Sequence, residues 1–182
     1  SNGLKVYLSD YKNEPRIQTA IAVKAGGKND PADNTGLAHY LEHMMFKGTK
    51  KHPAGEFSRI ISRNGGRENA FTGRDYTAYF QLLEKSRLPI SFELEADRMR
   101  NLLLEKKEFE KELAVVREER RMRTDDNPQS LTYEQFQASA FINGPYHNPV
   151  IGWMDDLENM NIQHLQEWYQ QWYSPENATL VV

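Results

Sequence analysis

The chain of 182 residues is long enough to form one domain with a hydrophobic core. Its formal net charge of −3 gives no reason to expect nucleic acid as a partner, and no apolar run is long enough to span a membrane. The absence of cysteine excludes disulfide bonds and thiolate zinc sites.

Hydrophobic periodicity and turn residues predict a mixture of strands and helices. In chain order, the expected elements are strands over 4–8 and 16–25, helices over 36–45 and 53–64, strands over 68–71 and 76–83, helices over 86–103, 105–124, 128–141 and 156–173, and a strand over 178–182. The first strand alternates as a half-buried strand does, and Thr35 is expected to cap the helix that follows it.

This order of elements indicates an α+β fold, in which helices pack on one face of an antiparallel β-sheet. No linker or internal repeat divides the chain, so residues 1–182 are expected to form a single domain. The chain ends on the apolar strand 179–182, and we therefore expect it to be a truncated part of a longer multi-domain protein. Residues 1–3 are expected to be vector-derived, because no Met precedes them.

The stretch His39-Tyr40-Leu41-Glu42-His43 carries the strongest chemical signal. Residues four apart share one face of a helix, so His39 and His43 can present two imidazole nitrogens to one metal ion. Glu42 lies close enough to polarise a water on that metal. The pattern H-x-x-E-H is the inverted zincin signature, and a catalytic zinc site needs three protein ligands and one open position. The alternative is a surface helix with two ordinary histidines.

The helix predicted over 105–124 offers a third ligand. At about 100° per residue, its apolar stripe contains two glutamates, Glu112 and Glu119, whereas Glu118 points away. A carboxylate on an apolar face needs a charged partner or a metal. Either the two glutamates meet Arg or Lys from the sheet, or Glu119 binds the metal and Glu112 accepts a hydrogen bond from a ligand imidazole.

Other polar residues have plainer interpretations. Apart from Glu119, the run 117–121 is expected to be a solvated helix face. His52 and His164 are expected on the surface. His147 lies in a Gly-Pro loop that could approach the site, but an ordinary loop residue is the favoured interpretation.

Taken together, these residues resemble the pitrilysin/insulinase family of zinc metallopeptidases, and within it the bacterial and mitochondrial processing-type peptidases. In that family a glutamate follows H-x-x-E-H by some 75 residues, and here Glu119 follows His43 by 76. A second family glutamate, seven residues earlier, corresponds to Glu112. Residues 66–72 resemble the family stretch G-x-x-N-A-x-T, and further similarity extends the resemblance from residue 6 to residue 182.

The resemblance implies a zinc-dependent endopeptidase that holds one Zn²⁺ ion per domain. Its ligands would be His39, His43 and Glu119, and Glu42 would be the general base that takes a proton from the attacking water. Asn69, Ala70 and Phe71 would lie on an edge strand that pairs with the substrate backbone. Without the resemblance, Asn69 reads as an ordinary strand-edge residue.

Members of this family close two related halves around an extended peptide, and the second half completes the active site. The resemblance therefore implies two partners, a peptide substrate and a second homologous domain or subunit. The isolated chain is expected to bind zinc but to hydrolyse peptides poorly or not at all.

Two other functions stay open. The first is a non-catalytic partner subunit of a paired peptidase, although such subunits usually lack part of the motif that is complete here. The second is a zinc-dependent hydrolase with a different substrate, against which the stretch 69–71 argues. The sequence leaves the compartment open between the bacterial periplasm or cell envelope and the cytoplasm, and it does not indicate a cleavage preference.

Overall fold

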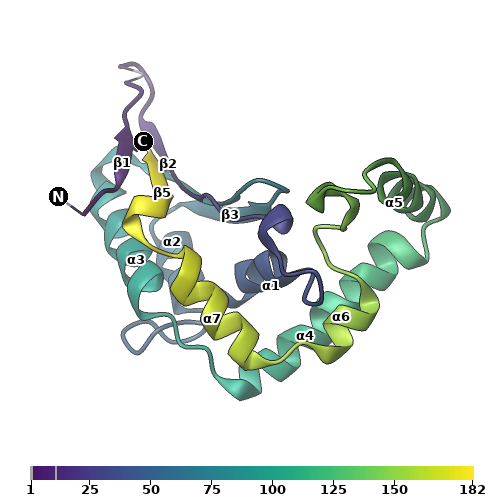
Figure 1. Cartoon of the computed structure of the whole chain (residues 1–182). Coiled ribbons are helices and arrows are strands. Elements are labelled where there is room, and N and C mark those ends of the chain that lie inside the picture. The colour runs from purple at the N-terminus through teal and green to yellow at the C-terminus, as the bar shows by residue number, and fades with distance from the viewer. Residues whose placement is uncertain (1, 11) are drawn as a thin grey trace.

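The computed structural model describes residues 2–10 and 12–182, so Ser1 of the segment expected to be vector-derived lies outside the described residues. A β-sheet lies above a layer of helices, and α5 projects to one side (Figure 1). In chain order the elements are β1 (Lys5–Tyr7), β2 (Arg16–Val23), η1 (Gly27–Asn29), α1 (Leu37–Met44), α2 (Glu56–Arg63), β3 (Arg67–Thr72), β4 (Thr77–Glu84), η2 (Lys85–Arg87), α3 (Leu88–Asn101), α4 (Lys106–Arg120), a π-helical turn η3 (Arg121–Asp125), α5 (Pro128–Ala140), η4 (Pro145–His147), α6 (Met154–Asn159), α7 (Ile162–Trp172), η5 (Pro175–Asn177) and β5 (Ala178–Val181).

The sheet has five strands in the order β1-β5-β2-β4-β3. Antiparallel pairs join β5 to β2, β2 to β4 and β4 to β3. Strand β1 pairs with β5 in parallel, so the sheet is mostly antiparallel. The predicted α+β class is therefore confirmed, and β3 forms one edge of the sheet, next to α1.

The helices cover one face of the sheet. Alternate residues of the central strands point toward that face and are buried beneath the helices. On β2 these residues include Ile21 and Val23, and on β4 they include Tyr79 and Leu83. The other face is less covered, and Phe71 on β3 is 45% exposed. Among the described residues, no helix is both long enough and apolar enough to cross a membrane.

The first strand differs from the prediction. Val6 is 59% exposed and Tyr7 is 61% exposed, so β1 is not half-buried. Alternation indicated that one face would be covered, but β1 lies at the outer edge of the sheet and pairs only with β5.

The predicted helix over 156–173 is also wrong, because two helices occupy this region. Met160 is extended, with φ −66° and ψ 139°, and ends α6. The Asn161 side chain then accepts a hydrogen bond from the backbone N–H of His164 at 3.1 Å and caps α7. A polar cap within an apolar periodic run thus starts a second helix.

The start of α1 is capped from further away than predicted. The Asp30 carboxylate accepts hydrogen bonds from the backbone N–H groups of Gly36, at 2.8 Å, and Ala38, at 2.9 Å. Thr35, the predicted cap, instead donates its hydroxyl and its backbone N–H to Asp156. Two separate carboxylates therefore fix the loop that leads into the histidine-bearing helix.

Arg120 corrects the prediction of a solvated face over 117–121, because it is only 4% exposed. Its guanidinium donates two hydrogen bonds to the Glu134 carboxylate, at 2.9 and 3.0 Å, and one to the Gly152 carbonyl at 2.9 Å. Glu134 is the buried residue of α5. This ion pair therefore attaches the projecting helix α5 to the end of α4.

Replacing Glu134 with Ala should lower the free energy of unfolding by about 3–5 kcal/mol, because it removes the two hydrogen bonds to the buried Arg120 guanidinium and leaves only the more distant Asp125 carboxylate, at 3.5 Å. Chemical denaturation measures this change, and amide hydrogen exchange should show faster exchange in α5. The matched control is Glu118→Ala, because Glu118 is 59% exposed and pairs with exposed Arg121. That control should change stability by less than about 0.5 kcal/mol. Equal effects of the two substitutions would contradict the anchoring role of Glu134.

Candidate metal centre

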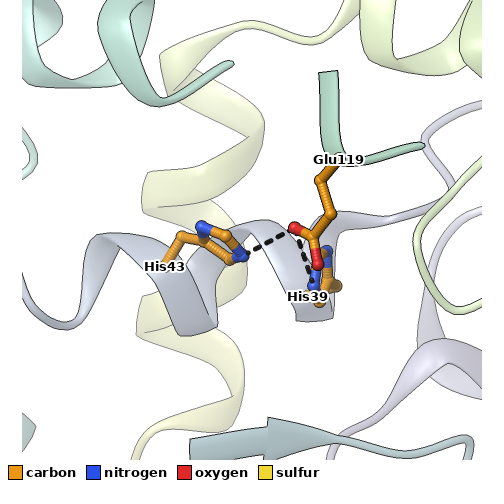
Figure 2. A group of neighbouring side chains, drawn as sticks. All are labelled: His39, His43 and Glu119. Carbon is orange, nitrogen blue, oxygen red and sulfur yellow. Dashed lines mark ion pairs between the residues drawn. The ribbon is translucent and has the colours of Figure 1, made fainter. Parts of the chain in front are cut away.

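Helices α1 and α4 bring the predicted site residues together. Tyr40, which follows His39 in the chain, is fully buried. Its hydroxyl donates to the Phe109 carbonyl, and its ring packs edge-on against the Phe109 ring. This contact fixes which side of α4 faces α1. As a result the two histidines of α1 lie opposite Glu119 near the end of α4 (Figure 2).

The geometry of the three side chains suits one metal ion. His43 Nε2 lies 3.2 Å from Glu119 Oε2, and His39 Nε2 lies 3.8 Å from the same oxygen. Potential ligand atoms of all three residues lie within 4.8 Å of one another. Nitrogen and oxygen ligands about 2.0–2.1 Å from a tetrahedral zinc ion are separated by roughly 3.3 Å, which is close to these distances.

His39 is held in the protonation state that binds metals. Burial lowers the pKa of His39 to about 3, and the nearby charges of His43 and Arg123 act in the same direction. A neutral imidazole has a free lone pair, whereas a protonated ring cannot be a ligand. His39 Nδ1 is buried and has no hydrogen-bond partner within the described residues.

His43 is oriented by Glu112, as the helix periodicity suggested. Its Nδ1–H group donates to Glu112 Oε1 at 2.9 Å, which leaves Nε2 directed at Glu119. Burial lowers the pKa of His43, but the hydrogen bond to Glu112 and the carboxylate charges of Glu119, Glu112 and Glu42 outweigh burial, so the pKa is raised. Glu112 also forms an ion pair with Lys47 Nζ at 2.5 Å, which stabilises the negative charge of the Glu112 carboxylate.

Glu42 projects from the same helix toward the β3 edge. Burial raises the pKa of Glu42, and a hydrogen bond from the Thr72 hydroxyl, at 2.5 Å, opposes this shift. A carboxylate whose pKa lies above the usual range suits the transfer of protons near neutral pH. Thr72 belongs to the stretch 66–72, but sequence reasoning gave it no role.

Strand β3 forms one wall of the cleft above these residues. The cleft has a volume of about 1000 Å³, and its lining includes the predicted metal ligands together with Asn69, Ala70, Phe71 and Thr72. Among the described strands, β3 has a partner only on its β4 side, so its other edge is free. The Asn69 side-chain carbonyl accepts from the backbone N–H of Ala70 at 2.9 Å, which does not connect Asn69 to either histidine.

Sequence reasoning missed two cations that compensate the carboxylates. Arg123 pairs with Glu119 Oε1 at 2.5 Å, and Lys47 pairs with Glu112. Arg123 follows Glu119 by four residues, so the spacing along the helix predicted over 105–124 was an available signal for it. Lys47 lies beyond the end of α1, and no helix spacing predicts its contact with Glu112. His147 lines a different cavity, and Glu118 is exposed as predicted.

Comparison with known proteins identifies the family. Residues 5–153 match the family model described as insulinase, or peptidase family M16. The zinc protease PqqE of Helicobacter pylori is 40% identical over the whole chain, which covers 41% of that protein. The crystal structure of a protease from the same organism superposes with a TM-score of 0.97 at 39% identity, over 99% of this chain and 44% of that one.

The similarity extends to much larger proteins. The crystal structure of pitrilysin superposes with a TM-score of 0.84 at 29% identity, over 99% of this chain and 20% of that one. The chain thus spans about two fifths of the curated relative described above, and a smaller share of pitrilysin. The family match and the inverted H-x-x-E-H helix agree, and the chain belongs to the insulinase family of zinc metallopeptidases, peptidase family M16.

Proposed function

We propose that this chain is the zinc-binding domain of an endopeptidase that cleaves extended peptides. One observation carries the proposal: two histidines and a glutamate converge within 4.8 Å, beside the partly buried carboxylate of Glu42 and a free strand edge. His39, His43 and Glu119 would hold one Zn²⁺ ion. Two imidazoles and one carboxylate are a donor set found in catalytic zinc sites. Three protein ligands leave the fourth position of a tetrahedral zinc ion open for water.

The chain's own residues divide the chemistry between them. Bound zinc would lower the pKa of a water and polarise the scissile carbonyl. Glu42 takes the proton from the attacking water and gives it to the leaving amine, while the Thr72 hydroxyl orients its carboxylate. Glu112 holds the His43 ring so that Nε2 faces the metal position.

The free edge of β3 would bind the substrate as an additional strand. Backbone groups of Asn69, Ala70 and Phe71 would pair with the peptide, and main-chain hydrogen bonds would give affinity for extended chains of varied sequence. This arrangement favours a peptide over other substrates of zinc hydrolases. It also explains why the strand edge and the predicted ligands share one cleft.

The relatives are longer than this chain, and we propose that a second homologous domain or subunit completes the active site. On this proposal residues 1–182 are one domain of a larger protein. A non-catalytic partner subunit is the alternative function. The complete set of His39, Glu42, His43 and Glu119 favours the enzyme, because a subunit without catalysis has no need of the base beside the ligands.

Replacing Glu42 with Gln in the whole protein should lower kcat by about 10²–10⁴-fold and leave one zinc ion bound per domain, because an amide cannot accept the water proton. Peptide hydrolysis and metal analysis of the same preparation measure the two effects. Retained hydrolysis with zinc bound would overturn the role of Glu42 as the base.

Replacing Glu112 with Gln should weaken zinc binding by about 10–100-fold, because the His43 ring loses its charged acceptor. Competition with a chromophoric chelator measures the affinity of this chain. Glu108→Gln is the matched control, since Glu108 lies one turn earlier on α4 and pairs with exposed Lys111. If both variants bind zinc as the unmodified chain does, Glu112 does not orient a ligand.

The isolated 182-residue chain should bind zinc with a stoichiometry of one and hydrolyse peptides far more slowly than the whole protein. The physical reason is that its cleft is closed on one side only and would leave a bound peptide open to water. Parallel assays of both forms on one fluorogenic peptide check this. Comparable turnover by the isolated chain would contradict the need for a second domain or subunit.

A further inference from the structure

A second cavity, of about 420 Å³, shares one lining residue, Arg123, with the metal cleft. Its walls come from the turn between β3 and β4, the π-helical turn, α5 and the loop that follows η4. The turn between β3 and β4 contributes Arg74 to the lining, and α5 contributes Gln137. The reaction proposed above makes no use of this cavity.

Among the residues that the structure describes, Arg74 forms no ion pair with a carboxylate, and the charge of the adjacent Asp75 acts on it. Its Nη2 donates to the neutral Gln137 side chain at 3.3 Å, and its guanidinium lies 5.6 Å from the Tyr146 ring centre. Its Nε is buried and has no hydrogen-bond partner among the described residues. The adjacent carboxylate, Asp75, is bound elsewhere, to Lys28 at 2.6 Å and to the Tyr146 hydroxyl at 2.7 Å.

The other charges around the cavity do not neutralise Arg74. Glu134 also lines the cavity, but its carboxylate receives two hydrogen bonds from Arg120. Arg123 lies at the boundary with the metal cleft, but its guanidinium already pairs with Glu119 Oε1 at 2.5 Å. A partly buried guanidinium whose Nε is unpaired, and whose Nη2 meets only a neutral amide, gains most from a carboxylate, which it can bind through two parallel hydrogen bonds.

The position of Arg74 is fixed by its backbone. The N–H groups of Gly27 and Lys28 donate to the carbonyls of Gly73, at 3.0 Å, and Arg74, at 2.9 Å. Gly26 permits this close approach, since a Cβ atom there would lie 2.5 Å from the Gly73 oxygen. A turn held in this way presents the guanidinium without an ordering penalty on binding.

The proposed substrate path leads into this cavity. A peptide on the β3 edge would most often pair antiparallel, which is the commoner arrangement between strands. Its residues N-terminal to the scissile bond would then pass Thr72 and approach Arg74. With the scissile bond placed beside Ala70, the centre of the proposed pairing stretch 69–71, the four residues to Arg74 span at most about 13 Å at about 3.3 Å per residue, since Arg74 lies in the turn after β3. This distance corresponds to at most three to four substrate residues.

We propose that this cavity is a specificity subsite for an acidic side chain, Asp or Glu, at the third or fourth residue N-terminal to the scissile bond. Arg74 binds the carboxylate. The inference rests on the proposed zinc peptidase function and on the β3 edge as the place where the substrate binds.

Peptides that end in a hydroxamate test the subsite without turnover, because the hydroxamate binds zinc and fixes the peptide on the N-terminal side of the cleavage position. Acetylated peptides would carry Glu, Gln or Lys third or fourth from the hydroxamate, with the zinc-loaded chain as receptor. We expect Glu to bind about tenfold more tightly than Gln at one of these positions, and Lys to bind more weakly than Gln. The preference for Glu over Gln should fall in 0.5 M NaCl, because salt screens the attraction between the carboxylate and the guanidinium.

Variants assign the preference to one side chain. Arg74→Gln should abolish the advantage of Glu over Gln and leave the affinity for the Gln peptide unchanged, whereas Arg74→Lys should retain part of it. Arg67→Gln is the matched control, because it removes the same charge from the opposite, exposed end of β3. It should retain the full preference.

The outcomes separate the subsite from the function on which it rests. If the Gln peptide binds but Glu gives no advantage, or if Arg74→Gln keeps the advantage, the acidic subsite is wrong and the zinc site stands. Succinyl hydroxamates occupy the opposite side of the cleft, and an acidic preference found only with them would overturn the assigned position. If no hydroxamate binds the zinc-treated chain, the proposed function fails and the subsite fails with it.

Discussion

The candidate site depends on one packing contact, between α1 and α4. Tyr40, with no exposed surface, lies against Phe109 and donates to its carbonyl, and this fixes both the rotation and the height of α4 relative to α1. Glu112 and Glu119 are two turns apart on α4, so one reaches Nδ1 of His43 and the other reaches Nε2. A different crossing of the helices would separate the acceptor that orients the ring from the carboxylate that completes the ligand set.

This packing concentrates negative charge in a partly buried cleft. Glu42, Glu112 and Glu119 converge on two histidines, and each carboxylate has a compensating donor that other elements supply. Lys47 forms an ion pair with Glu112, and Arg123 forms one with Glu119. Glu42 instead accepts a hydrogen bond from the Thr72 hydroxyl. The donor to Glu42 is neutral, and burial raises the pKa of that carboxyl. The group proposed as base is thus the one whose charge the protein compensates least, which is what proton transfer requires.

Helix periodicity was enough to place His39 and His43 on one face of α1, and Glu112 and Glu119 on one face of α4, because each face is set by local spacing along one helix. It left the partners of the glutamates open, and the family resemblance paired them with the histidines. The remaining features depend on contacts between distant segments. Arg120 looked solvated because its partner lies 14 residues later on α5, and its third acceptor is the carbonyl of Gly152. The cap of α1 by Asp30 and the start of α7 at Asn161 likewise depend on hydrogen bonds from polar side chains, which hydrophobic periodicity does not predict. The fold class was predictable because strand alternation and helix spacing differ, whereas the exposure of β1 depends on its place at the sheet edge.

The end of α4 shows how one short segment can meet several structural requirements at once. Successive helical residues point about 100° apart, so Glu119 faces α1 while Arg120 faces α5. The helix then changes to a π-helical turn over Arg121–Asp125, an irregularity that is common at functional sites. Arg123 in that turn reaches back to Glu119 and also lines the second cavity. The segment that carries the third predicted ligand therefore anchors α5 and borders both cavities, so α5 is attached to the same helix end that carries Glu119.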